Sequence, residues 1–169
     1  MMAFQRVSLK KLDNQLFIYE KNAEAMASSK DEVDLMKRRA LSFLEVAKYS
    51  LQRGMYDLAA FNAEQAAQLY LKATLLEKIG DFPRTHSIIF LLNELRRVDE
   101  EEVGRFIRGD KNGLHNLEDA YLTNYFYKKF DEDDGRYLVS LAEEVIKFCE
   151  KLGSGVGKGK NPQGMGKVD

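Results

Sequence analysis

Apolar side chains recur every three or four residues along most of the chain, a spacing that gathers them on one face of an α-helix. Ser29 and Glu32 have the spacing of a capping box, so the pattern predicts a helix that begins near Ser29 and ends near Gly54. Its apolar side carries Met36, Ala40, Phe43, Leu44, Ala47 and Leu51. The stretch 7–26 before it has a thinner apolar stripe and predicts an extra N-terminal helix.

The segment 57–79 is apolar over more than half of a helical circumference. Asp57 is placed to cap its start, and Gly80 follows its end. One line of the helix holds large residues, namely Leu58, Phe61, Leu69 and Leu76, and a second line is mostly small, namely Ala59, Ala63, Ala66, Tyr70 and Ala73. A helix with two apolar lines packs against neighbours on both sides, so we expect this segment at the centre of the fold.

Shorter helices are predicted after Pro83, over residues 85–97, 100–108 and 115–123, and a longer one over 131–152. The acidic runs 99–102 and 131–134 are predicted to cap two of them, because carboxylates favour helix N-termini. No strand pattern appears in the sequence, and short connections make consecutive helices antiparallel. The predicted fold is therefore all-α: an antiparallel up-and-down bundle of four to five helices over residues 30–152, with residues 1–29 as an N-terminal helical appendage.

Residues 153–169 differ in composition from the rest of the chain. They hold six of its 12 glycines and three lysines, which predicts a flexible Gly/Lys-rich tail. The pair Gly157 and Lys158 invites comparison with a phosphate-binding loop, which needs a glycine five residues earlier and a Ser or Thr after the lysine. This chain has Leu152 and Gly159 at those positions, so no such loop is predicted.

Composition and charge exclude several classes of protein. The chain has 26 Lys and Arg against 27 Asp and Glu, a net charge of −1, so we expect no DNA partner of the kind that binds a strongly basic surface. The single cysteine, Cys149, excludes an intrachain disulfide and a Cys-rich zinc site. Neither His86 nor His115 has the preceding Glu of a di-iron motif, so no metal or cofactor is predicted. No membrane span or secretion signal is found, which makes the cytoplasm the expected location.

An ordered set of short motifs resembles the HEPN domain family (higher eukaryotes and prokaryotes nucleotide-binding). Residues 54–60 read Gly-Met-Tyr-Asp-Leu-Ala-Ala, and Ala63, Gln65-Ala66-Ala67 and Leu71-Lys72-Ala73 follow. Residues 85–88 read Thr-His-Ser-Ile, with Leu91-Leu92 after them, and residues 117–121 read Leu-Glu-Asp-Ala-Tyr. The resemblance implies a four- to five-helix bundle that forms a homodimer. It also implies a partner of the minimal nucleotidyltransferase type, in a toxin–antitoxin-like pair, or a metal-independent RNase.

RNase members of that family use an Arg and a His that are separated by four to six residues near the dimer interface. Arg108 and His115, with six residues between them, are the catalytic candidates that this likeness implies. An arginine offers a fork of donors to a phosphate, and a histidine exchanges protons near neutral pH. Two features depart from the pattern: the intervening residues look like a turn, and Thr123 and Asn124 stand where related sequences have an arginine. We therefore expect a nucleotide- or RNA-binding or partner-binding module first, and an RNase as the alternative.

Other polar and aromatic residues have both a structural and a functional interpretation. His86 and Gln65 are predicted to be structural, with His86 bonding to nearby backbone or to the preceding helix and Gln65 bonding between helices, as Tyr56 would. Tyr121, Lys128 and Lys129 are candidates for nucleotide or RNA binding, or in the case of Tyr121 for modification by a partner. The neighbouring aromatic residues Tyr125, Phe126, Tyr127 and Phe130 are predicted to close the core or to contact another subunit.

Overall fold

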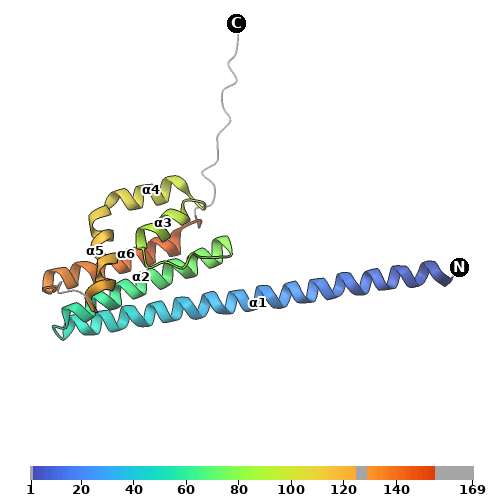
Figure 1. Cartoon of the computed structure of the whole chain (residues 1–169), viewed down its shortest axis with the longest axis horizontal. Coiled ribbons are helices and arrows are strands. Elements are labelled where there is room, and N and C mark those ends of the chain that lie inside the picture. The colour runs from blue at the N-terminus through green and yellow to red at the C-terminus, as the bar shows by residue number, and fades with distance from the viewer. Residues whose placement is uncertain (1, 125–128, 155–169) are drawn as a thin grey trace, which may run out of the picture.

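The computed structural model describes residues 2–124 and 129–154, and all regular structure in these residues is helical. The helices are α1 (Met2–Gln52), α2 (Tyr56–Ile79), α3 (Ile88–Leu95), α4 (Glu100–Gly109), α5 (Lys111–Asp119), the 3-10 helix η1 (Ala120–Asn124) and α6 (Glu132–Lys151). The all-α antiparallel bundle is thus confirmed (Figure 1). Within the described residues, no helix is both long enough and apolar enough to cross a lipid bilayer.

The first helix is continuous from Met2 to Gln52, so the helix start predicted at Ser29 is wrong. The residues around Ser29 favour helix and include neither Gly nor Pro, so a capping-box spacing alone does not interrupt the helix. The predicted appendage is therefore the first half of the same helix that enters the bundle. Figure 1 shows this half extending past the ends of the other helices, with the N-terminus far from them.

Helix α2 lies at the centre, packed against α1 on one side and α6 on another. Its line of small residues is fully buried, including Ala59, Ala63, Ala66 and Ala73, because methyl groups let neighbouring helices approach closely. Its line of larger residues is only partly covered, and Leu58 is 45% exposed. Both apolar lines were predicted, but the small residues, rather than the large ones, form the deepest contact.

The ends of α2 show one correct and one incorrect prediction. Gly80 ends the helix at φ +92, a left-handed conformation that glycine adopts without strain. Asp57 does not cap the start, since the N-cap residue is Met55, without a side-chain hydrogen bond. The Asp57 carboxylate instead accepts a hydrogen bond of 2.7 Å from the backbone N–H of Phe130. Asp57 therefore connects α2 to the segment before α6.

The three short helices cover one end and one side of the α1–α2–α6 core. Helix α3 is shorter than predicted, because Ser87 caps it by accepting a hydrogen bond from the N–H of Phe90. Helix α5 begins at Lys111, four residues before its predicted start. Asp99 caps α4, and Asp131 forms a reciprocal capping box with Asp134 at the start of α6, so the capping role predicted for the acidic runs is confirmed.

Candidate functional site

Arg108 and His115 lie on two consecutive helices that a single residue joins. Arg108 is in the last turn of α4, His115 is in the second turn of α5, and both side chains are exposed. Asp110 between the helices accepts a hydrogen bond of 3.0 Å from the N–H of Gly113 and another from the hydroxyl of Tyr137 on α6. The turn-like segment expected from the sequence is thus a corner between two helices, fixed to α6.

Gly113 lies at this corner, where two neighbouring side chains approach its Cα closely. A Cβ atom at that position would collide with the Tyr137 hydroxyl and with the Asp110 carboxylate. Gly113 lies inside α5, where it lets the capping residue Asp110 and Tyr137 of α6 come close. The corner sets the directions in which α4 and α5 project, and with them the positions of Arg108 and His115.

The guanidinium group of Arg108 lies next to that of Arg96, over the backbone of Gly104. A methyl group on Gly104 would lie 3.1 Å from Nη1 of Arg108 and 3.3 Å from Nη1 of Arg96. Arg96 is held by Asn93, whose Oδ1 accepts from its Nε at 2.8 Å, and by Glu100 at 2.5 Å. Among the residues whose side chains are described, 15–122 and 129–154, Arg108 has no carboxylate partner.

Two like charges brought together repel one another unless an anion lies between or beside them. Glu100 offsets the charge of Arg96, but the charge of Arg108 is uncompensated by any described residue. A phosphate oxygen is the kind of acceptor that the donors of two guanidinium groups fit. His115 forms no described hydrogen bond with Arg108. In a single chain the two residues therefore lie at the same corner, but their side chains are not linked by a hydrogen bond.

A second polar cluster lies inside the bundle, on α2. Glu64 is fully buried and accepts hydrogen bonds from Gln65 Nε2 at 2.7 Å and from Gln68 Nε2 at 2.6 Å. Burial raises the pKa of Glu64 to about 7, against the opposing effects of these hydrogen bonds and of Lys72. Lys72 donates to Gln68 Oε1 at 2.9 Å, and burial lowers its own pKa. The Gln65 predicted to bond between helices thus serves a buried carboxyl group on its own helix.

His86, which is exposed, connects this polar cluster to the surface of the protein. Gln68 Nε2 lies 3.3 Å from His86 Nδ1, so His86 contacts the preceding helix, α2. The ring of His86 stacks on that of Tyr121 with centroids 4.0 Å apart. Beside them, Glu118 accepts hydrogen bonds from the Ser87 hydroxyl and from the N–H of Ile89. The rings and Glu118 line a small open pocket of about 290 Å³.

The candidates near residue 128 are only partly within the described residues. Lys128 and the aromatic residues Tyr125, Phe126 and Tyr127 lie outside them. Lys129 is exposed and Phe130 is buried in the core. Tyr121 is half-buried, and its ring contact is with His86.

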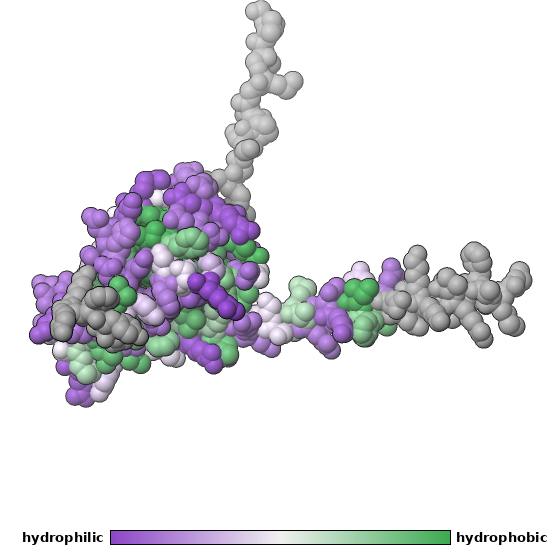
Figure 2. All heavy atoms as spheres, viewed as in Figure 1, coloured by the Kyte–Doolittle hydropathy of each residue, from purple (hydrophilic) through white to green (hydrophobic). Residues whose placement is uncertain are grey.

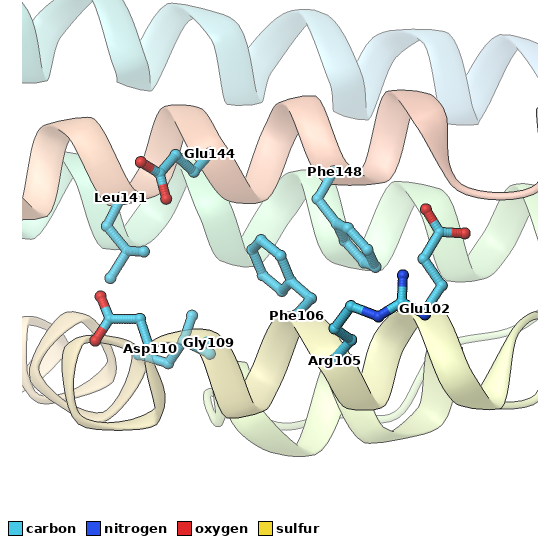
Figure 3. Close-up of a pocket in the computed structure, with 9 residues that line it drawn as sticks. Glu102, Arg105, Phe106, Gly109, Asp110, Leu141, Glu144 and Phe148 are labelled. Atoms are coloured by element: carbon cyan, nitrogen blue, oxygen red, sulfur yellow. The ribbon is translucent and has the colours of Figure 1, made fainter.

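A larger groove of about 460 Å³ lies among α4, α5 and α6. Figure 3 shows Phe106 of α4 facing Phe148 of α6, and their rings stack at 4.2 Å. Arg105 and Glu102 lie at one end of the groove, and Asp110 lies at the other. This groove is on the opposite side of α6 from α1 (Figure 3).

Sequence reasoning missed Glu64, Arg96 and the Phe106–Phe148 pair. A carboxylate between the two alanine-rich turns of the most apolar helix was a signal that could have identified Glu64. Arg96 had no such signal, because it meets Arg108 only through the packing of α3 on α4.

Comparisons with known proteins agree on the family of this chain. The family model of the HEPN domain matches residues 33–152. Among solved structures, TT1696 from Thermus thermophilus is similar with a TM-score of 0.58 and 25% identity, over 71% of this chain and 97% of its own. A HEPN domain protein (TM0613) from Thermotoga maritima is similar with a TM-score of 0.53 and 26% identity, over 72% of this chain and 98% of its own. No curated protein matches. Since the matched region covers most of the helical bundle described above, this chain belongs to the HEPN domain family.

Proposed function

We propose that this protein is a homodimeric HEPN module that binds RNA or a nucleotide through phosphate contacts at Arg96 and Arg108. The observation that carries the proposal is the convergence of these two guanidinium groups over Gly104, with no carboxylate partner for Arg108 among the described residues. Arg96 is held in place by Asn93 and Glu100, so little side-chain freedom is lost when an anion binds. The near-zero net charge of the chain agrees with a local anion site rather than with a broad basic surface.

Replacing Arg108 with alanine is expected to weaken RNA binding roughly ten- to a hundredfold, because a hydrogen bond to a charged group contributes about 1.5–3 kcal/mol. The measurement is the fluorescence anisotropy of a labelled single-stranded RNA titrated with the full chain at several salt concentrations. The variant should also show a smaller salt dependence, since one fewer phosphate is neutralised.

Arg105→Ala is the matched control for this experiment. Arg105 is exposed on the same helix, but its guanidinium pairs with Glu101 at 2.6 Å. Its loss should change binding little. Equal affinities for the Arg108 and Arg105 variants would contradict the proposed site.

The homodimer is supported by the partly exposed line of apolar residues on α2. Leu58 is 45% exposed, and Phe61, Leu69 and Leu76 along the same line are only half-buried. A second HEPN bundle would cover this line and bring two Arg108–His115 corners into one particle.

We include in the proposal a protein partner of the minimal nucleotidyltransferase type, for which Tyr121, at the edge of the small pocket, is the candidate for modification.

A metal-independent RNase is the second candidate function, favoured by the placement of Arg108 and His115 on either side of one fixed corner. In that case Arg108 would hold the scissile phosphate and His115 would exchange the proton with the ribose hydroxyl or the leaving oxygen. Labelled RNA incubated with the full chain in EDTA should stay intact if the protein only binds. Cleavage that is lost in both Arg108→Ala and His115→Ala, and kept in Arg105→Ala, would establish the RNase.

A further inference from the structure

The first half of α1 exposes large apolar side chains. We call residues 2–28 of this helix the rod, and the side chains of residues 15–28 are described. Leu16 is 61% exposed, and Tyr19 and Met26 are each 74% exposed. Figure 2 shows apolar surface along the part of the rod that is described. An isolated helix of this length gains no stability from packing, so its apolar residues need an explanation.

Four apolar residues of the rod have heptad spacing, whereas the exposed Phe17 and Ile18 lie off this line. Leu16, Tyr19, Ala23 and Met26 are separated by three, four and three residues, which is the seam of a coiled coil. In the sequence, the same spacing extends back to Leu12 and Leu9. We call this line of residues the seam.

The seam continues without a break into the bundle, where α2 covers it. The next positions at the same spacing include Val33, Ala40, Leu44 and Ala47, and all four are buried. Lys37 occupies one seam position there, and its Nζ reaches Glu77 of α2 at 2.8 Å. One face of α1 is therefore a helix-packing surface along its whole described length, but α2 covers only the C-terminal part.

The part of the seam that α2 covers ends where α2 itself ends. Leu76 and Glu77, in the last turn of α2, lie beside Met26, Ser29, Lys30 and Val33 of α1. Gly80 then stops α2. The HEPN family model also begins at residue 33, and both solved relatives account for nearly all of their own length with about 71% of this chain. The rod is thus an addition to the shared bundle.

We propose that the rod of a second copy of this chain covers the seam, as an antiparallel two-stranded coiled coil. The connection between α1 and α2 is three residues long, so α2 runs antiparallel to α1. An antiparallel partner rod would run in the same direction as α2 and cover the part of the seam beyond the end of α2. The two bundles would then lie at opposite ends of the paired rods. A parallel partner would place its own residues 33–52 in the space that α2 occupies.

The charges beside the seam agree with pairing between identical helices. The flanking positions of the described part are Gln15, Glu20, Asn22, Ala27 and Ser29, and only Glu20 is charged. Pairing of two identical rods therefore brings few like charges together. A different partner that was selected by charge would require charged residues at these flanking positions of the rod. The rod is about 40 Å long at 1.5 Å per residue, which gives room for more than three heptads.

The test is the molar mass of the full chain by multi-angle light scattering. Leu16→Glu places a charge in the seam and is expected to lower the mass of the particle to what the bundle alone forms, a monomer or, where the bundles dimerise as proposed above, a dimer. Ile18→Glu is the matched control, since Ile18 is 57% exposed but lies off the seam, and this variant should keep the full mass. Neither residue contacts the bundle core, so both variants should keep the unfolding temperature of the bundle.

Two results of the mass measurement would overturn the proposal. A full chain with the same mass as Leu16→Glu would show that a second copy does not cover the seam. Equal disruption by Leu16→Glu and Ile18→Glu would show that the rod associates through general hydrophobicity rather than through the heptad face.

The orientation is tested by the distance between spin labels on Ser28→Cys in the two copies. Ser28 is exposed, and the native Cys149 is buried and does not take the label. Antiparallel rods that pair along their length place the two labels about 30 Å or more apart along the axis, from the rise of 1.5 Å per residue. A separation of only the width of a coiled coil would show parallel rods and would overturn the antiparallel arrangement.

Discussion

Replacing Glu64 with glutamine is expected to remove a fall in folding stability that the native chain shows between about pH 4.5 and pH 7. Burial raises the pKa of Glu64 from 4.5 to about 7 in the folded chain. The folded state therefore holds this proton more tightly than the unfolded state does, so its contribution is fully present below pH 4.5 and is lost as the pH rises through 7. Because a tenfold difference in proton affinity corresponds to about 1.4 kcal/mol, the loss is roughly 3 kcal/mol.

The measurement is the free energy of unfolding by urea at several values from pH 5 to pH 8. Other carboxylates also titrate in this range, so the informative quantity is the difference between the native chain and Glu64→Gln at each pH. Glu77→Gln is the control, because Glu77 is on the same helix but is exposed. A difference between native and Glu64→Gln that does not change with pH would show that Glu64 titrates as an ordinary carboxylate.

Glu64 also shows how much of the interior the sequence could specify. The alanines on either side of it predicted a buried helix, and the structure confirms that position for α2. The periodicity does not say which polar residue on such a helix finds partners. Gln65 and Gln68 satisfy the carboxylate locally, but its connection to His86 depends on where the chain returns after Pro83.

Helix ends were predictable where one residue determines them, and not where competing residues do. Gly80, Asp99 and Asp131 each terminate or cap a helix where the sequence predicted it. Ser29 has a capping-box partner, but the helix formers around it make continuation more favourable. Tertiary contact outweighed local preference at Asp57, whose carboxylate binds the N–H of Phe130, 73 residues away.

The candidate site was predictable in part for the same reason. Arg108 and His115 are seven positions apart, so their spacing could be found in the sequence and compared with a family pattern. Arg96 is brought beside Arg108 by the turn between α3 and α4, and no spacing rule identifies such a pair. The rigidity of the corner at Asp110 was missed for a similar reason, since it depends on Tyr137 of α6.

Leu71→Ala is expected to destabilise the bundle by about 2–5 kcal/mol, towards the upper end of that range. Leu71 is on α2 and is fully buried. Removing its side chain leaves a cavity, and the cost depends on how far the neighbours can collapse into it. Ala67, one turn earlier, and the other buried alanines of α2 carry only methyl groups and cannot fill the space. The measurement is the free energy of unfolding by urea at constant pH.

Leu58→Ala is the same substitution on the same helix, at a side chain that is 45% exposed, and it should cost much less than Leu71→Ala. The comparison separates burial from helix propensity, because both variants exchange leucine for the same residue in α2. The result also bears on the proposed homodimer. If Leu58→Ala costs as much as Leu71→Ala, and its cost falls when the protein is diluted, then the exposed line of α2 is covered by another subunit. Equal costs at every concentration would instead contradict the central position of α2, because the alanine-lined face would then contribute no more to stability than the outer one.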